Sequence, residues 1–269
     1  MPETVLDRIV ADVRRRLAWT PEAPGLERIA LRTVERRRSQ GKRSLRKALA
    51  GPEPEIIAEC KRASPSAGVI RTDFNPVALA RAYAAGRAAA ISVVTEPDSF
   101  GGEPLWLAQV REAVPLPVLR KDFIVERRQL FESAVLGADA VLLISRLLTA
   151  KRLAELLTTA AMLELEVLLE IFVDEDPAQA IASGAPILGV NSRDLATFSV
   201  DLDRAQAMAA MLPDDRIKVA ESGIHGPEDV ARLHAAGYRA FLVGEHLVRS
   251  DDPEWAVRRL TGQLARSGH

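Results

Sequence analysis

The stretch IAECKRASPS, residues 57–66, is an apolar segment that ends in two opposite charges and a Ser-Pro-Ser turn. Because side chains alternate between the two faces of a β-strand, Glu59 and Lys61 share one face. The other face carries the apolar or small side chains of Ile56, Ala58 and Cys60. A carboxylate and an ammonium at the end of a hydrophobic strand cost free energy unless binding or chemistry uses them. We therefore expect this strand end to belong to a functional site.

The same construction recurs at four further places along the chain. Short apolar runs end in Lys121 and Phe123, in Glu170, in Asn191 and Arg193, and in Glu221. One charged strand end has no special meaning, but five of them require an architecture that brings strand ends together. The fold must therefore place the ends of several strands around one location.

From about residue 55 onward, short apolar segments alternate with amphipathic segments rich in Ala and Leu. We predict eight strands, at residues 55–60, 90–95, 117–121, 138–144, 166–171, 187–190, 217–220 and 240–243. Between them, Asn75-Pro76, Asp176-Pro177 and Gly226-Pro227 predict helix starts, and Gly86, Gly137, Gly184 and Gly237 predict helix ends. Strands that alternate with helices pair in parallel through right-handed crossovers.

Eight such units predict an α/β protein with a closed (β/α)8 barrel, the TIM barrel. An open doubly wound sheet is the rival fold, but no Gly-rich dinucleotide fingerprint follows the first strand. Residues 5–17 have the spacing of an amphipathic helix, with one apolar face formed by Leu6, Ile9, Val10, Val13 and Leu17. We expect one domain over residues 1–269, in which residues 1–50 form a helical extension packed on the barrel.

Composition excludes several classes of function. The 36 Lys and Arg residues nearly balance the 37 Asp and Glu residues, so no net field favours nucleic acid. Residues 35–47 (ERRRSQGKRSLRK) contain no aromatic side chain, and we interpret them as a helical face balanced by acids elsewhere. No segment predicts membrane insertion, and a single cysteine fits a reducing compartment, so we expect a cytoplasmic protein. The four histidines lack metal-ligand spacing, so we expect no metal.

A TIM barrel places its active site at the carboxyl ends of the strands. This rule gathers seven charged or polar side chains around one mouth: Glu59, Lys61, Lys121, Glu170, Asn191, Arg193 and Glu221. Carboxylates and cations in such a set neutralise one another, which makes their burial possible. For the whole set, we predict catalysis rather than exposed ion pairs.

The last two units of the barrel indicate a phosphate site. Ser222-Gly223 follows the seventh strand and Gly244-Glu245 follows the eighth, where this fold often binds phosphate through backbone N–H groups. Taken singly, these glycines are equally consistent with tight turns. The planar guanidinium of Arg193 suits a substrate carboxylate. We expect a small phosphorylated substrate as the partner.

The strings IAECKRASPS, ISVVTE, VLRKDFIV, LLEI, GVNSRDL, VAESGI and LVGE occur in this order. The set resembles the indole-3-glycerol phosphate synthase family of tryptophan biosynthesis, and the resemblance covers nearly the whole chain. It implies conversion of 1-(2-carboxyphenylamino)-1-deoxyribulose 5-phosphate to indole-3-glycerol phosphate, carbon dioxide and water. It also implies that the reaction needs neither a metal nor a cofactor.

The resemblance implies a role for each residue of the site. Lys121 matches the general acid of ring closure, and Lys61, Glu59 and Glu170 are the candidates for dehydration, with Glu170 favoured as the base. Asn191 and Arg193 hold the substrate carboxylate and orient its ring, and Glu221 positions a hydroxyl or a lysine. The phosphate end consists of Ser64, Ser222, Gly223, Gly244 and Glu245, with help from Lys61. Phe123 and the loop around Phe100 would line the ring pocket, although a Phe at a barrel mouth is equally consistent with rim packing.

The chain departs from the family pattern in small ways. Residues 126–129 (ERRQ) replace a more usual Asp-Pro-Tyr-Gln, and Arg87 stands where a small residue is usual. His246 follows the Gly-Glu turn, where we favour local packing over a phosphate contact. The alternatives are a sibling barrel such as phosphoribosylanthranilate isomerase, or a catalytically silent scaffold. For the oligomeric state we allow a monomer or a weak homodimer.

Overall fold

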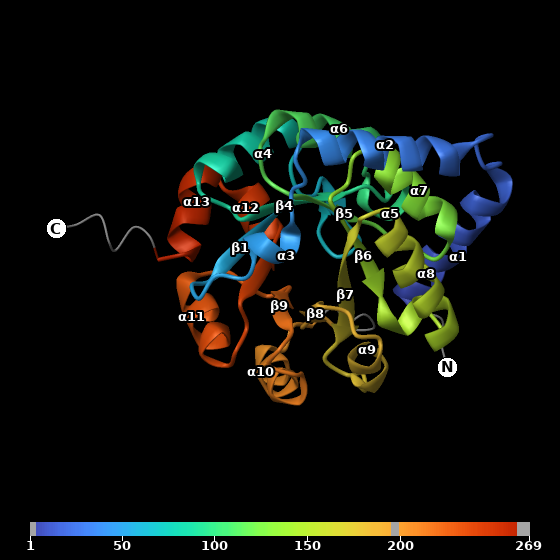
Figure 1. Cartoon of the computed structure of the whole chain (residues 1–269). Helices are drawn as coiled ribbons and strands as arrows, with labels where there is room; N and C mark the ends of the chain where they lie inside the picture. Colours follow the sequence, from blue (N-terminus) through green and yellow to red (C-terminus); the bar gives the residue numbers. More distant parts are fainter. Residues whose placement is uncertain (1–3, 195–198, 263–269) are drawn as a thin grey trace.

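The computed structural model describes residues 4–194 and 199–262, and its centre is a closed barrel of eight parallel strands (Figure 1). The strands are neighbours in the order β1-β10-β9-β8-β7-β6-β5-β4. Their bounds are β1 Glu55–Cys60, β4 Ala90–Val94, β5 Val118–Lys121, β6 Ala140–Ile144, β7 Glu166–Phe172, β8 Ile187–Asn191, β9 Ile217–Glu221 and β10 Ala240–Val243. The (β/α)8 prediction is therefore confirmed, and each predicted strand end lies within two residues of the observed one.

Helices surround the barrel and precede it. The chain begins with α1 Val5–Trp19, α2 Leu26–Gln40 and α3 Leu45–Ala48. The connections between strands carry α4 Pro76–Ala85, α5 Pro97–Phe100, α6 Pro104–Ala113, α7 Arg127–Val135, the 3-10 turn η1 Ser145–Leu147, α8 Ala150–Met162, α9 Ala178–Ala182, α10 Leu202–Met211 and α11 Pro227–Ala235. After the last strand come α12 Glu245–Arg249 and α13 Pro253–Leu260. None of the helices in this part of the chain is long and apolar enough to cross a membrane.

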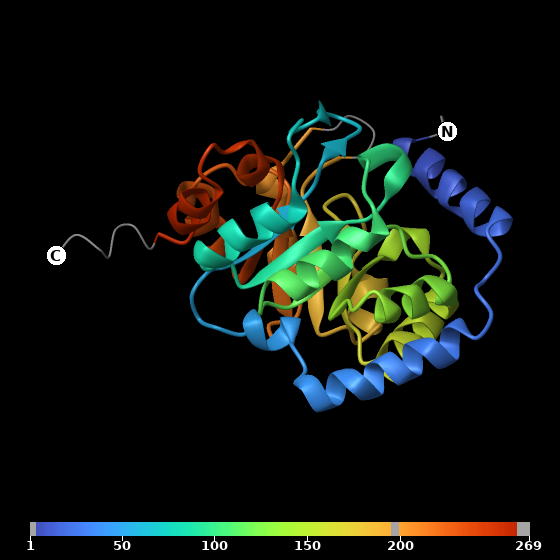
Figure 2. The ribbon, with the colours of Figure 1, turned by 90° about the horizontal axis from the view of Figure 1, so that it is seen from above.

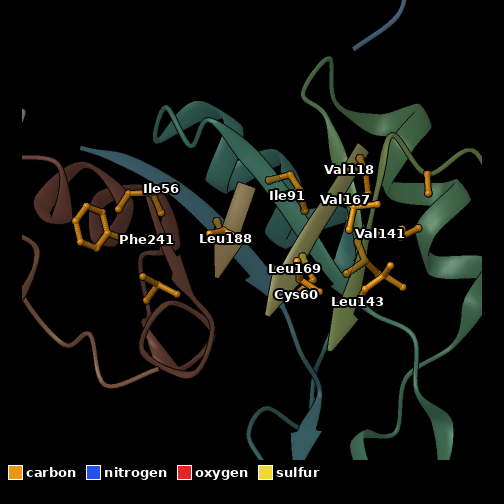
Figure 3. Close-up of a cluster of buried hydrophobic side chains, with 14 of the residues drawn as sticks. Ile56, Cys60, Ile91, Val118, Val141, Leu143, Val167, Leu169, Leu188 and Phe241 are labelled. Atoms are coloured by element: carbon orange, nitrogen blue, oxygen red, sulfur yellow. The ribbon is translucent and has the colours of Figure 1, made fainter. Parts of the chain in front are cut away.

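Side-chain alternation along the strands divides the buried apolar residues into two cores. The core inside the barrel contains Ile57, Leu119, Leu142, Leu168 and Val219, and it also includes Leu45 of α3 and Leu49, the residue that follows α3. The core between strands and helices contains, among others, Ile56, Cys60, Ile91, Val118 and Phe241 (Figure 3). Ile56 and Cys60 thus face the helices, as the alternation predicts, and Glu59 and Lys61 face the barrel interior.

The N-terminal helices lie on the outside of the barrel (Figure 2). The five residues predicted to form the apolar face of α1 are all buried. Leu26, Ala30 and Val34 of α2 join the outer core, and α2 lies against α7. Two arginines of the basic run bind acids of the barrel, since Arg37 lies 3.5 Å from Asp139 and Arg38 lies 2.6 Å from Glu164.

Two local features differ from the sequence-based expectation. Gly86 ends α4 with an ordinary φ of −71°, and Arg87 adopts the left-handed conformation with φ 66°. Gly86 is needed for another reason, because a Cβ there would lie 2.6 Å from the carbonyl oxygen of Glu254. A short hairpin of β2 Ala63–Ser64 and β3 Gly68–Val69 also follows β1, and the sequence patterns did not predict it.

Candidate active site

A pocket opens at the carboxyl ends of the barrel strands. Thirteen residues were predicted for the site, and all of them line this pocket: Glu59, Lys61, Ser64, Lys121, Phe123, Glu170, Asn191, Arg193, Glu221, Ser222, Gly223, Gly244 and Glu245. They come from the ends of six different strands, β1, β5, β7, β8, β9 and β10, so no local segment of the chain creates the site. Closure of the barrel brings them together, while their individual roles stay predictions.

The ammonium of Lys121, at the end of β5, lies between two buried carboxylates. Its Nζ donates a hydrogen bond of 3.1 Å to Glu170 Oε2 and lies 3.7 Å from Glu221 Oε2. Glu170 ends an apolar run of β7, and Glu221 is the last residue of β9. Both glutamates are about 2% exposed, so their charges interact through an environment with little water.

This arrangement moves two pKa values away from their ordinary positions. Burial by itself disfavours the ammonium, but the charges of Glu170, Glu221 and Glu59 outweigh it and raise the pKa of Lys121. Burial and the neighbouring Glu170 carboxylate raise the pKa of Glu221 well above that of an exposed glutamate. Lys121 is therefore a stable cation at neutral pH, and Glu221 holds a proton more readily than an ordinary carboxyl.

The pair with which β1 ends forms a second charged group in the pocket. Lys61 Nζ lies 3.1 Å from Glu59 Oε1, and the Glu59 side chain is almost fully buried. Gly244 after β10 allows this placement, because a Cβ at that position would lie 2.3 Å from Glu59 Oε1. The strand end that stood out in the sequence is thus packed directly against the last βα turn of the barrel.

The turn after β9 holds an unusual backbone conformation. Ser222 and Gly223 both have left-handed φ values, 68° and 74°. Ser222 Oγ donates a hydrogen bond of 2.8 Å to Asn191 Oδ1, and the same oxygen accepts the N–H of Arg193 at 3.0 Å. A non-glycine residue in this region is strained, and such strain often occurs at functional sites. Asn191 therefore links the turns after β8 and β9.

The end of the pocket near β9 and β10 is lined by the two short turns after these strands and by two histidines. The Glu245 carboxylate pairs with Arg249 at 2.9 Å, so part of its negative charge is neutralised. His225 and His246 also line the pocket, and their rings meet edge to face with centroids 6.4 Å apart. Burial, and then the neighbouring His225 and Arg259, lower the pKa of His246. His246 thus lines the pocket as a predominantly neutral side chain at pH 7.

One wall of the pocket is apolar, and part of it comes from α1. The rings of Phe100 and Phe123 are 6.0 Å apart, and Leu6 and Ile9 of α1 join them in the lining. Sequence reasoning placed Leu6 and Ile9 on a buried face but did not assign them to the site. Periodicity reports that a helix face is buried and not which surface covers it, so no signal in the sequence identified them.

The described residues contain no cluster of three or more His, Cys, Asp or Glu side chains arranged to hold a metal ion. The polar lining includes glutamates paired with lysines, an arginine, an asparagine, an aspartate, two histidines and short turns rich in serine and glycine. Such a set can donate protons, accept protons and bind anions.

Comparison with known proteins connects this geometry to a family. The family model named indole-3-glycerol phosphate synthase matches residues 6–260. A protein of that name from Nocardioides sp. is 46% identical over 272 residues, covering 96% of this chain and 98% of the relative. Another from Burkholderia multivorans is 41% identical over 256 residues, covering 95% and 98%. A third from Rhodopirellula baltica is 48% identical over 205 residues, covering 76% and 79%.

Two solved structures are similar in fold. A mutant tryptophan synthase alpha-subunit from Pyrococcus furiosus has a TM-score of 0.60 and 12% identity, covering 78% of this chain and 98% of its own. A thiamine phosphate pyrophosphorylase from the same organism has a TM-score of 0.59 and 15% identity, covering 84% and 100%. At such low identity these two show the barrel alone. With a family match over residues 6–260 and relatives above 40% identity, the chain belongs to the indole-3-glycerol phosphate synthase family.

Proposed function

We propose that this chain converts 1-(2-carboxyphenylamino)-1-deoxyribulose 5-phosphate to indole-3-glycerol phosphate, carbon dioxide and water, as a carboxy-lyase. The observation that carries the proposal is the Lys121 ammonium held between Glu170 and Glu221 in a pocket with an apolar wall. The family match over residues 6–260 supports the same reaction.

Ring closure is the step for which Lys121 is suited. The aromatic carbon that bears the carboxylate attacks the ketone carbon, and the ketone oxygen must gain a proton as the new bond forms. Lys121 remains an ammonium because three glutamates raise its pKa, so it is charged when substrate arrives. It donates the proton, and its positive charge stabilises the developing alkoxide. Loss of carbon dioxide then restores the aromatic ring and needs no base.

Dehydration requires an acid and a base on the same intermediate. One group protonates the departing hydroxyl. Another accepts the proton that the intermediate loses as the double bond of the new five-membered ring forms. The Glu59–Lys61 pair and Glu170 lie in the same pocket, and Glu170 is our candidate for the base. Glu170 already accepts a hydrogen bond from Lys121, so proton transfer from Glu170 to Lys121 restores these two residues, and the acid that protonated the departing hydroxyl regains its proton from solvent.

Two ends of the pocket hold the substrate. Arg193 and Asn191 are assigned to the carboxylate and the orientation of the anthranilate ring, beside the wall formed by Phe100 and Phe123. The phosphate is assigned to Ser64, Ser222, Gly223, Gly244 and Glu245, with Lys61 as the nearby cation. The left-handed φ values of Ser222 and Gly223 support this assignment, because successive backbone N–H groups in such turns can form an anion-binding concavity. Glu221 is assigned to positioning a hydroxyl or Lys121.

The two alternatives receive less support. A sibling isomerase shares a phosphate end but does not require the Glu59–Lys61 pair, and a silent scaffold does not require buried ion pairs at the strand ends. We also infer that residues 1–50 and the barrel form one domain, because α1 and α2 contribute to the same apolar clusters as the barrel loops and helices. A cytoplasmic location and a monomeric or weakly dimeric state stay predictions from the sequence.

The direct test is to mix the purified protein with the carboxyphenylamino-deoxyribulose phosphate and follow indole fluorescence. We expect turnover, and a folded protein without any signal would refute the proposal. Lys121→Ala is expected to lower kcat by at least about 10²-fold, the usual contribution of a general acid. Lys218→Met is the matched control, because Lys218 is buried on β9 but donates outward to the carbonyl of Ala209 in α10. That variant is expected to retain kcat.

A further inference from the structure

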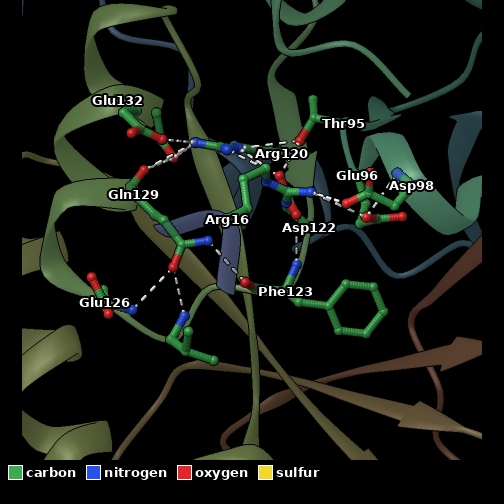
Figure 4. Close-up of polar contacts among 12 residues, drawn as sticks. Arg16, Thr95, Glu96, Asp98, Arg120, Asp122, Phe123, Glu126, Gln129 and Glu132 are labelled. Atoms are coloured by element: carbon green, nitrogen blue, oxygen red, sulfur yellow. Dashed lines mark hydrogen bonds and ion pairs between the residues drawn. The ribbon is translucent and has the colours of Figure 1, made fainter. Parts of the chain in front are cut away.

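Arg120 and Asp122 form a buried ion pair on either side of Lys121 in the sequence. Both residues are 4% exposed, and Arg120 Nη2 donates a hydrogen bond of 2.9 Å to Asp122 Oδ2 (Figure 4). Strand alternation turns the Arg120 side chain away from the barrel interior, toward α7. Arg120 therefore lies outside the catalytic pocket, next to the strand end that carries its lysine.

Asp122 uses its oxygens to fix three neighbours. Oδ2 accepts the hydroxyl of Thr95 at 2.6 Å in addition to the guanidinium of Arg120, and Oδ1 accepts the backbone N–H of Phe123 at 2.8 Å. A carboxylate that binds both a guanidinium and a backbone N–H makes short, strongly oriented hydrogen bonds. The backbone at Phe123 is therefore tied directly to the buried pair.

The other side of the Arg120 guanidinium reaches α7. Its Nη1 donates to the carbonyl of Gln129 and to Ser133 Oγ, both at 3.0 Å. The amide of Gln129 in turn donates to the carbonyl of Phe123 at 2.9 Å. It also accepts the N–H groups of Val125 and Glu126 at 2.9 and 3.0 Å. Asp122 and Gln129 thus bind three backbone N–H groups and one carbonyl of the turn after β5, and Arg120 donates hydrogen bonds to both residues.

The network also reaches the preceding βα turn. Thr95 follows β4, and the next residue, Glu96, accepts the N–H groups of Ser99 and Phe100 at 2.7 and 3.1 Å. The Phe100 ring is thereby held 6.0 Å from the Phe123 ring in the wall of the pocket. Asp122 thus binds the turn that carries Phe123, and Glu96 binds the turn that carries Phe100. Thr95 links the two turns, because it donates to Asp122 and directly precedes Glu96.

A buried ion pair is weak evidence for stabilisation. Desolvation of both charges offsets much of their attraction, and apolar residues of similar volume often replace such a pair without loss of stability. Apolar residues cannot replace the hydrogen bonds of the pair, because only the planar guanidinium of Arg120 binds Asp122, Gln129 and Ser133 at once. The arrangement is therefore suited to fixing the position of a turn more than to stabilising the fold.

We propose that the Arg120–Asp122 pair positions Lys121 and Phe123 for the reaction by fixing the turn formed by residues 122–126. Arg120 does not line the pocket, and the carboxylate of Asp122 is bound to Arg120, to Thr95 and to the N–H of Phe123, so the pair acts through Lys121 and Phe123. This inference rests on the proposed function, because it assigns those two residues to proton donation and to the ring pocket. Displacing catalytic groups by about 1 Å is enough to lower rates by about 10²-fold.

The test compares Asp122→Asn with Asp139→Asn. Asp139 is the matched control: it is also buried and lies 3.0 Å from a guanidinium nitrogen, that of Arg111, but just before β6, at the opposite end of the barrel. We expect Asp122→Asn to lower kcat about 10- to 100-fold with a smaller change in KM. We expect Asp139→Asn to lower Tm and to leave kcat within about twofold. Amide hydrogen exchange at Phe123, Val125 and Glu126 should accelerate only in Asp122→Asn.

Three further variants keep the inference testable. If Asp122→Asn does not fold, Thr95→Val removes only one hydrogen bond of Asp122 and should lower kcat about 3- to 10-fold. Arg120→Lys keeps the charge without the fork, so it should lower kcat less than Arg120→Met. Equal kcat values for wild type and Asp122→Asn, or unchanged exchange in the turn, would overturn the inference. A wild-type protein without turnover would instead refute the proposed function, and hydrogen exchange would still report on the turn.

Discussion

At the scale of single residues, a glycine on one strand provides the space for a glutamate of the site on the next strand. Gly189 of β8 faces the barrel interior, and a Cβ there would lie 2.2 Å from Glu221 Oε1. Glu221 therefore occupies a position that only a missing side chain on the neighbouring strand makes available. Its burial raises its pKa, and folding consequently favours the protonated form. This gives stability a pH dependence that can be measured.

We expect Glu221→Gln to become more stable relative to wild type as pH rises above about 4.5. A carboxyl whose folded pKa is raised binds more protons in the folded state, so its contribution to stability is lost as pH rises above the unfolded pKa. Glutamine does not titrate and escapes this loss, which amounts to at most about 1.4 kcal/mol per pH unit. Urea denaturation at several pH values measures the difference.

An exposed carboxylate provides the control for that comparison. Glu112→Gln on α6 removes a negative charge at the surface. It therefore shows the effect of losing a charge alone, without the effect of removing a buried carboxylate. A Glu221→Gln stability difference that stays constant from pH 5 to pH 9 would contradict a raised pKa. We also expect Glu221→Gln to lose activity, since stability and function often oppose each other at such sites.

At the scale of secondary-structure elements, α1 forms both a support and a wall. Its face of Ile9, Val13 and Leu17 packs with Val125, beside Phe100 and Phe123. Arg16 pairs with Asp98 and lies 3.6 Å from Glu96, the residue that caps α5. The same helix lines the pocket through Leu6 and Ile9. Docking of α1 therefore completes the apolar end of the site.

We expect Val13→Ser to raise KM about tenfold while kcat changes less. Val13 is fully buried, and a buried hydroxyl without a partner costs about 1–3 kcal/mol, which weakens the docking of α1. The wall near the substrate is then lost in a fraction of molecules, while the lysines and glutamates of the barrel keep their places. Steady-state kinetics measures both constants. Arg14→Ala, on the exposed side of the same helix, should leave KM unchanged; a similar rise there would contradict the docking argument.

At the scale of the whole molecule, closure of the barrel is what assembles the site. β1 pairs with β10 through Ile56 and Phe241 among other positions, and this pairing joins the first strand to the last. Both side chains are fully buried in the outer core (Figure 3). Loss of packing at this seam affects a contact between residues 185 positions apart, so it weakens the fold as a unit.

We expect Phe241→Ala to lower the free energy of unfolding by about 3–5 kcal/mol, the usual cost of removing a buried Phe side chain. Urea denaturation followed by circular dichroism measures this loss. Val69→Ala, at an exposed position of the β2–β3 hairpin, should change stability by less than about 0.5 kcal/mol. A loss near 1 kcal/mol for Phe241→Ala would mean that the seam contributes little to the stability of the barrel.

Much of the fold was predictable because the strands and helices have periodic patterns. The charged ends of the runs at Glu59, Lys121 and Glu221 indicated strand ends, and the count of eight units indicated closure. The β2–β3 hairpin was missed, since two-residue strands have no period. The left-handed position at Arg87 was missed too, because Gly86 was expected to take it and is instead needed for packing against α13.

By itself the sequence determined the order of the elements, which residues at the strand ends point into the barrel, and the family. These properties depend on local spacing and on short motifs. Only the tertiary structure decided that Lys121 lies between Glu170 and Glu221, that Gly189 makes room for Glu221, and that α1 forms a wall of the pocket. These contacts join residues far apart in the chain, and their distances follow from barrel closure and close packing. No pattern along a single strand or helix contains that information.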